Sequence, residues 1–226
     1  MSEEIFKMDE DSENVYSIVC DKGDMLLEST LINNNKAFRL NFILNNIDPV
    51  KINLKNLLSH NIYELIEKFN PDLIEKIHIL NIYNEDEADI MMLFKHIAKE
   101  IGIKKKYILF NTTRTIDFNN NVIEFKNEDI SLKNKELNDN YISKLNLNNY
   151  EPLIYKQGHI HIKLENCNLN LINLANEQTF NDKINTRFTT DFQILTTDDL
   201  PLYMENIVGL MIKKVFYNLK QFIDKL

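Results

Sequence analysis

Tryptophan is absent from this 226-residue sequence, and glycine, proline and cysteine are scarce, at four, four and two residues. So few glycines leave little material for tight active-site turns. The chain has no Gly-rich phosphate loop, no Gly-x-Ser-x-Gly nucleophile turn and no His-Glu-x-x-His motif. Cys20 and Cys167 lie far apart in a sequence without a signal peptide, so we expect free thiols in a reducing compartment. These absences argue against a hydrolase or a transferase.

An excess of positive charge and a long apolar run are also missing. Asp and Glu outnumber Lys and Arg by 34 to 26, a net charge of −8, whereas a protein that binds nucleic acid over its whole surface needs excess cations. No apolar run approaches the length of about 20 residues that spans a bilayer. We therefore expect a soluble, intracellular protein, in the cytoplasm, the nucleus or a virion. The abundant Asn and Ile indicate AT-rich codons of a virus, protist or bacterium.

The sequence does contain many segments in which apolar and polar residues alternate, the pattern of half-buried β-strands. The first two, 15–20 and 25–32, are separated by a hairpin-like turn that contains Gly23. The Asn-rich runs 33–35 and 119–121 are expected to be loops. Further strands are predicted at 37–44, 76–83, 106–110, 113–118, 121–125, 158–164, 168–174 and 186–195.

Apolar residues at intervals of three and four predict amphipathic helices elsewhere. They are expected over 51–69, over 85–101 and from about residue 199 to the end, with a short helix near 139–145. Residues 1–14 are acidic and polar and are expected to form a flexible tail. The elements together predict an α+β fold.

The segment Gln157–Cys167, QGHIHIKLENC, holds the best candidate for metal chemistry. His159 and His161 are two apart on a predicted strand and therefore point to the same face, where Cys167 could join them from the next strand. The competing interpretation is a strand with its isoleucines inward and its histidines in solvent. Lys163 shares the histidine face and would repel a cation, so we favour the second interpretation and predict no metal.

Other charged clusters have simple structural explanations. Asp86, Glu87 and Asp89 are expected at the start of a helix, where the helix dipole favours acids, and they lack the pattern of a calcium loop. Lys104–Lys106 follows a predicted helix end, where cations are favoured for the same reason. We find no catalytic residues and predict no cofactor.

From Asn81 onward the order of elements resembles the platform subunit of multisubunit DNA-dependent RNA polymerase. This family comprises the bacterial alpha subunit and its archaeal, eukaryotic and viral third-largest-subunit counterparts. Ile101-Gly102-Ile103 stands in place of the family's Ile-Pro-Leu-like turn, Phe125–Asp129 in place of its Val-x-Ser-x-Asp-like motif, and Ile162–Leu171 in place of its Leu-x-x-Gly-Gln-x-Leu-like stretch. The closing segment FQILTTDDLPLYMENIVGLMIKKVFYNL resembles the family's last strand and long dimerisation helix.

This resemblance implies an antiparallel or mixed sheet with two long amphipathic helices, 51–69 and 201–226, that form a dimerisation layer. Residues 15–103 and 186–226 would make up the dimerisation domain, and residues 104–185 an inserted small β-rich region. The chain would be a non-catalytic assembly subunit of a DNA-directed RNA polymerase, itself a nucleotidyltransferase complex. It would heterodimerise with an alpha-like partner and hold the large catalytic subunits, with little direct nucleic-acid contact. The expected interface residues are Leu54, Leu57, Leu58, Ile207, Leu210, Met211, Val215 and Leu219.

Two alternatives remain open at this stage. The first is a structural or interaction protein of unrelated α+β fold without enzymatic activity, either of virion type or a homo-oligomer held together by the same apolar helix. The second is a metal-dependent enzyme built on His159 and His161.

Overall fold

The computed structural model describes residues 15–48, 51, 54–96, 104–131, 135–165, 184–194 and 202–225. The predicted tail 1–14, the predicted strand 168–174 and Cys167 lie outside these ranges. The strands are β1 (Ser17–Asp21), β2 (Met25–Ile32), β3 (Asn35–Ile47), β4 (Ile74–Asn84), β5 (Glu87–Phe94), β6 (Lys105–Asp117), β7 (Val122–Asp129), β8 (Tyr150–Pro152), β9 (Tyr155–Glu165) and β10 (Ile184–Ile194). The helices are α1 (Leu54–Leu57), α2 (Ile62–Phe69), α3 (Lys135–Lys144) and α5 (Leu202–Ile223).

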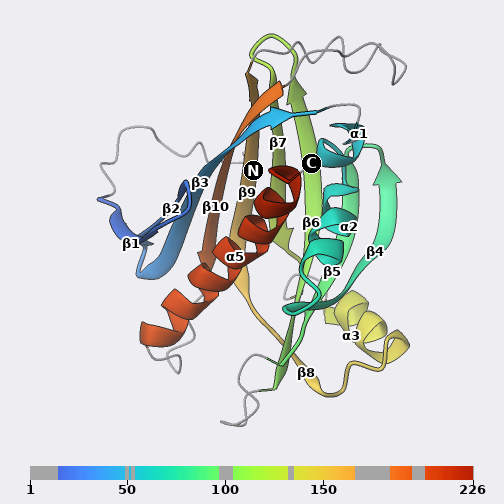
Figure 1. The fold of residues 1–226 in the computed structure, drawn as a ribbon. Coiled ribbons are helices and arrows are strands. Elements are labelled where there is room, and N and C mark those ends of the chain that lie inside the picture. Colours follow the sequence, from blue (N-terminus) through green and yellow to red (C-terminus); the bar gives the residue numbers. More distant parts are fainter. Residues whose placement is uncertain are drawn as a thin grey trace, which may run out of the picture.

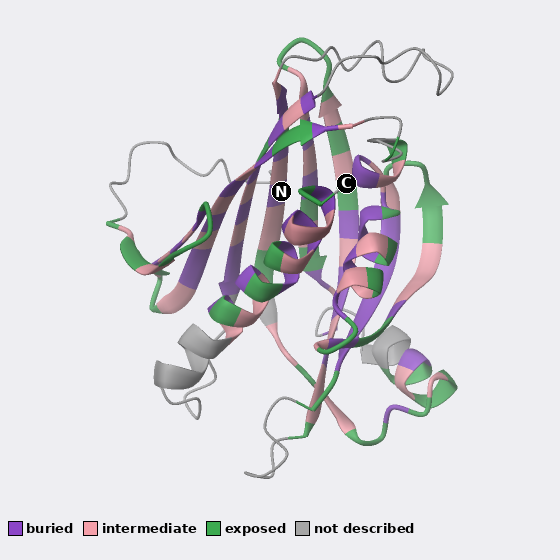
Figure 2. Ribbon diagram, in the orientation of Figure 1, coloured by how far each residue is buried: buried purple, intermediate pink, exposed green. Residues whose placement is uncertain are grey.

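The ten strands of the described ranges belong to one sheet, in the order β1-β2-β3-β10-β9-β7-β6-β5-β4, with β8 paired to β6. Every pairing is antiparallel except that of β6 with β8. The sheet curves, and α5 lies across its concave face beside α2 (Figure 1). The main core fills the space between these helices and the sheet, and Figure 2 shows the alternation of buried and more exposed positions along the strands.

Asparagines supply the positive φ angles that the hairpin turns need. Asn33 and Asn34, between β2 and β3, have φ of 51° and 63°, which matches a two-residue turn with both central residues left-handed. Asn121, at the β6–β7 turn, has φ of 54°, and Gly23, at the β1–β2 turn, has φ of 65°. Residues 33–34 and 119–121 are therefore turns, as predicted, whereas Asn35 begins β3.

The helix predicted over 85–101 is wrong, because residues 87–94 form strand β5. Ile90 and Met92 point into the main core, whereas Met91 and Leu93 belong to a second apolar cluster with residues that include Tyr141 of α3. A strand buried on both faces loses the two-residue alternation and reads as a continuous apolar run. Periodicity alone does not distinguish such a strand from a helix.

The prediction of two long helices in a dimerisation layer is also wrong. Residues 51–69 contain two short helices, α1 and α2, because the chain turns between them. In this turn the Asn61 side chain donates to Asn56 Oδ1, and the Asn61 backbone N–H donates to Ser59 Oγ; such local bonds compete with helix formation. The final helix is confirmed as α5, but it packs on the chain's own sheet. The predicted inserted β-rich region is wrong as well, since β6, β7 and β9 are inner strands of the single sheet.

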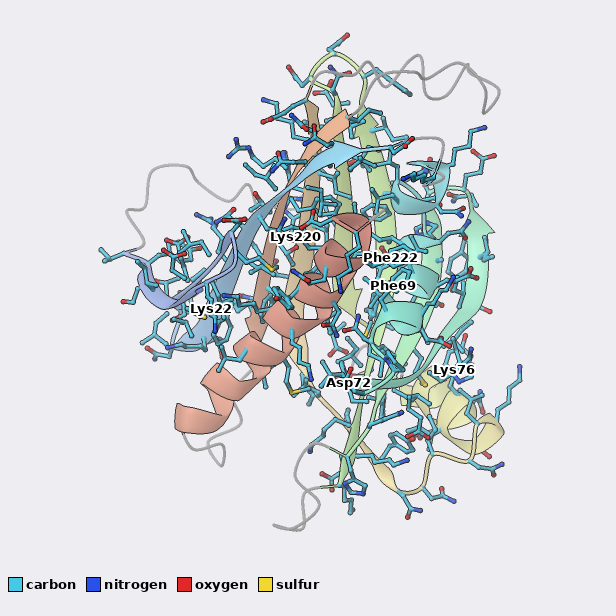
Figure 3. The ribbon with its side chains drawn as sticks, in the orientation of Figure 1. Lys22, Phe69, Asp72, Lys76, Lys220 and Phe222 are labelled. Carbon is cyan, nitrogen blue, oxygen red and sulfur yellow. The ribbon has the colours of Figure 1, made fainter. Side chains whose placement is uncertain are left out.

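Helices α2 and α5 are joined by aromatic and polar contacts. Phe69 and Phe222 stack with their ring centroids 3.8 Å apart, side by side in Figure 3. Asn70, which follows α2 and is fully buried, donates from Nδ2 to the carbonyls of Ile66 and Val215 at 2.8 and 3.2 Å. Its Oδ1 accepts from Asn218 Nδ2 at 2.9 Å. This one side chain therefore ties the end of α2 to two successive turns of α5.

Gly209 allows α5 to approach the sheet closely. A Cβ atom at this position would lie 2.5 Å from Cε1 of Phe38 on β3. The Phe38 ring has little freedom to move away, because it is buried and stacks on Phe192 with ring centroids 5.2 Å apart. A glycine is thus required at this helix–sheet contact.

Candidate functional site

A cavity of about 140 Å³ lies between α5, α2 and the sheet. Its walls come from α2, α5, five strands and the β8–β9 connection, and most of the side chains are aliphatic or aromatic. The residues that border it are Tyr63, Ile66, Met92, Phe94, Ile108, Phe110, Asn127, Leu153, Gly158, His159, Ile160, Thr190, Asp191, Phe192, Val208, Met211, Ile212, Val215 and Phe216.

Two sequence features create the cavity. On α5, Val208, Met211, Ile212 and Val215 follow the three-and-four spacing that places side chains on one helix face. On the sheet, Gly158 of β9 stands between Phe192 of β10 and Asn127 of β7 in one cross-strand row. A position without a side chain in this row leaves open space beneath α5.

The polar groups in the cavity wall are uncharged. Tyr63 Oη donates to Asn127 Oδ1 at 3.0 Å and lies 3.3 Å from Thr112 Oγ1. Burial raises the pKa of Tyr63 to about 12, partly offset by these two hydrogen bonds. Thr190 is buried, and its Oγ1 has no hydrogen-bonding partner among the described residues. The cavity is therefore apolar with a few neutral polar groups, the usual composition of a small-molecule site.

This environment of Tyr63 makes a testable prediction about alkaline pH. The buried neutral phenol stabilises the fold fully below pH 10, and its contribution of about 3 kcal/mol is lost as the pH rises toward about 12. Ultraviolet absorbance against pH should show a late tyrosine ionisation that is missing in Tyr63→Phe. Ionisation of every tyrosine near pH 10 in the folded protein would contradict the prediction.

His159 and Asp191 border the cavity with their backbones, because alternation turns their side chains to the other face of the sheet. There Asp191 Oδ1 accepts from Arg39 Nε at 2.8 Å. His159 Nε2 and His161 Nδ1 lie 3.7 and 3.3 Å from Glu124 Oε1. Burial lowers the pKa of His159, although Glu124 acts in the opposite direction. These side chains form a polar cross-strand row outside the cavity.

The described residues contain no group of three or more His, Cys, Asp or Glu side chains placed to hold a metal ion. His159 and His161 share one face of β9, as predicted, while Cys167 lies outside the described ranges. The other charged clusters find partners within the chain. Asp89 accepts from Asn81, Tyr83 and Asn111, and Lys104 and Lys106 both pair with Glu151.

Most of the predicted interface residues contact the chain's own core. Leu57, Leu58, Val215 and Leu219 are buried, and Met211 is partly buried against the core and borders the cavity. Leu210 is 44% exposed. The side chains of Leu54 and Ile207 lie outside the described part. A contact of these residues with a partner chain stays a prediction.

Sequence reasoning missed the residues that define the cavity, above all Tyr63, Thr190 and Gly158. Gly158 offered the one local signal, since a glycine within a strand often marks a bend or a close approach of another group. Tyr63 and Thr190 gave none. They are 127 residues apart and meet only in the folded chain.

None of the helices that the structure describes is long and apolar enough to cross a membrane.

No protein-family model and no curated protein matches the sequence. Solved structures do match the fold. The human StarD13 (DLC2) lipid transfer and protein localization domain has a TM-score of 0.61 at 8% identity, over 92% of this chain and 88% of that one. Human STARD10 has a TM-score of 0.59 at 8% identity, over 93% and 73%. The StAR-related lipid transfer protein fragment from Xanthomonas axonopodis has a TM-score of 0.55 at 11% identity, over 92% and 98%.

The chain therefore has the helix-grip fold of the StAR-related lipid transfer domains. This finding overturns the predicted RNA polymerase platform subunit, with its role in transcription, its alpha-like partner and its large polymerase subunits. The short motifs that suggested the polymerase subunit depended on the order of strands and helices along the chain. A different α+β fold can have a similar order. Of the alternatives, the one with an unrelated α+β fold agrees better with the findings.

Proposed function

We propose that this protein binds a lipid, or another molecule with a large apolar part, in the cavity between α5 and the sheet. The observation that carries the proposal is the cavity itself, which is lined mostly by apolar side chains from α2, α5 and the concave face of the sheet. Two of the similar structures bear lipid transfer in their names. Fold alone does not determine function, so the cavity is the stronger argument.

The size of the cavity limits what enters this conformation. An engineered cavity of about 150 Å³ holds benzene, whereas drug-sized ligands occupy pockets of about 300–1,000 Å³. The observed volume of about 140 Å³ therefore admits a small group or one end of an acyl chain. A whole lipid requires additional space between α5 and the sheet.

The cavity-lining residues of α5 differ in how they are held to the sheet: Val208, Met211 and Ile212 precede Lys213, and Val215 and Phe216 follow it. Residues 208–212 are apolar or glycine, so their side chains hold the helix to the sheet by packing alone. The side-chain hydrogen bonds of α5 that the structure describes begin at Lys213, which donates to Met25 O and Cys20 Sγ. We therefore expect ligand entry to displace residues 208–212 more readily than the part of α5 from Lys213 onward.

Filling the cavity should abolish binding. In Met211→Trp a larger side chain occupies the space under α5, and we expect affinity for the neutral fluorescent probe N-phenyl-1-naphthylamine to fall at least about tenfold. Leu210→Trp is the matched control, because the neighbouring Leu210 is exposed and does not border the cavity. Fluorescence titration measures both variants, with circular dichroism to check folding. A wild-type protein without saturable binding, or equal binding by both variants, would refute the proposal.

A further inference from the structure

We infer that the ligand is an uncharged amphiphile whose hydroxyl or carbonyl oxygen hydrogen-bonds to Thr190 in the cavity wall. This inference rests on the proposed function and adds the chemical class of the ligand. It assigns to Thr190 the selection of neutral, oxygen-bearing molecules over plain hydrocarbons and over anionic lipids.

The residues that surround Thr190 on the inner face of the sheet are apolar. In the two neighbouring strands it pairs with Leu40 and Ile160, and the inward residues two positions away on β10 are Phe188 and Phe192. Thr190 is 5% exposed, and Oγ1 has no hydrogen-bonding partner among the described residues. A buried hydroxyl without a partner is unfavourable. A ligand oxygen at the cavity wall would supply the missing bond.

The other hydroxyl in the cavity wall, that of Tyr63, is already engaged. Tyr63 Oη is hydrogen-bonded to Asn127 Oδ1 and lies within hydrogen-bonding distance of Thr112 Oγ1. The Thr190 side chain is thus the cavity-lining hydroxyl that can still form a hydrogen bond with a ligand. A hydroxyl both donates and accepts, so it suits an alcohol or a carbonyl equally well.

Charge in the surroundings disfavours an anionic ligand. Arg39 is paired with Asp191 on the opposite face of the sheet. The buried lysines of α5 also point elsewhere, since Lys213 bonds Cys20 and Met25, and Lys220 bonds Asp224. Among the described residues, no Lys or Arg borders the cavity. Burying a carboxylate or phosphate there without a counter-charge is strongly unfavourable.

Thr186 provides a matched control within the same strand. It lies four residues before Thr190 on β10 and faces the same side of the sheet, it is fully buried, and its Oγ1 also lacks a partner among the described residues. It does not border the cavity. Thr186→Val and Thr190→Val therefore remove the same kind of hydroxyl, and only Thr190→Val removes it from the ligand site.

The test is displacement of N-phenyl-1-naphthylamine by three eight-carbon competitors, octane, 1-octanol and octanoate, at neutral pH. We expect wild-type protein and Thr186→Val to bind 1-octanol best and octanoate worst. Thr190→Val should bind 1-octanol about tenfold more weakly, the equivalent of one hydrogen bond, and octane unchanged. Both valine variants should raise the midpoint of thermal unfolding, which confirms that they fold.

The outcomes separate this inference from the proposed function. Unchanged preference for 1-octanol in Thr190→Val, or tightest binding of octanoate by the wild-type protein, overturns the inference while apolar binding stands. An equal loss of 1-octanol binding in Thr186→Val also overturns it, because the effect would then be structural. Absence of saturable binding for the probe and all three competitors overturns the proposed function, and the inference with it.

Discussion

Asn70→Asp should lower the free energy of unfolding by about 3–5 kcal/mol at neutral pH, the range found when a buried charge loses its partner. Asn70 is fully buried, and its amide donates to the carbonyls of Ile66 and Val215. A carboxylate at this position would place negative charge against both carbonyl oxygens and remove two hydrogen bonds. The link between α2 and α5 would be the first to break.

The effect should depend on pH in a defined direction. Burial beside two carbonyls raises the pKa of the introduced carboxyl above its ordinary value of about 3.9. The variant is therefore least unstable when the carboxyl is protonated at acidic pH, and the stability is lost as the pH rises through the raised pKa. Urea unfolding at neutral and mildly acidic pH measures the difference between variant and wild type.

Asn61→Asp is the control for this experiment. Asn61 is exposed and stands at the N-cap position of α2 without a side-chain capping hydrogen bond, and the helix dipole favours an acid there. We expect its stability to stay within about 0.5 kcal/mol of the wild type. A similarly small effect of Asn70→Asp would show that the buried amide does not hold the two helices together.

The close contact between Gly209 and Phe38 gives the second large effect. Phe38→Ala should lower the free energy of unfolding by about 3–5 kcal/mol, since it empties a buried aromatic position. Gly209→Leu should lower it by about 1–3 kcal/mol, because the added side chain meets the Phe38 ring. The gain in helix propensity on replacing glycine, about 1 kcal/mol, opposes only part of this overpacking.

The double variant tests whether the two single substitutions destabilise the protein through the same contact or independently. In the double variant the leucine side chain at position 209 enters the space that the phenyl ring leaves. We therefore expect the combined loss to be smaller than the sum of the single losses by more than about 1 kcal/mol, as for residues in direct contact. Additive losses in denaturant unfolding would mean that α5 does not rest on Phe38.

The sequence allowed prediction of strands that have one face toward the core and the other toward solvent. β3, β9 and β10 alternate polar and apolar residues, and their expected positions 37–44, 158–164 and 186–195 overlap the observed strands. β5 failed because both of its faces are covered, one by the main core and the other by α3 and its neighbours. Burial on two faces is a property of the tertiary structure, and it erases the local period that the prediction used.

The candidate site was beyond prediction for a similar reason. Its apolar residues carry the same spacing as any core residue, so the sequence predicted Met211 and Val215 for a protein interface and did not indicate that they border a cavity. His159 and His161 drew attention because imidazole is chemically distinctive, whereas the unpartnered Thr190 hydroxyl is recognised only once its neighbours are known. A polar residue in a strand can be assigned to a binding site only when it is known which face of the sheet it lies on and which groups it hydrogen-bonds.

The position of β10 has a consequence for the route by which the chain folds. This strand, residues 184–194, pairs with β3 on one side and β9 on the other. The hairpin of β2 and β3 is synthesised well before β10, and it cannot join the rest of the sheet until β10 is made, because Phe42 and its partner Phe188 are 146 residues apart. Pairings of such long sequence separation fold slowly. The edge of β3 that pairs with β10 therefore stays open while the residues between them are synthesised, and an unpaired strand edge in a partly folded chain is prone to aggregation.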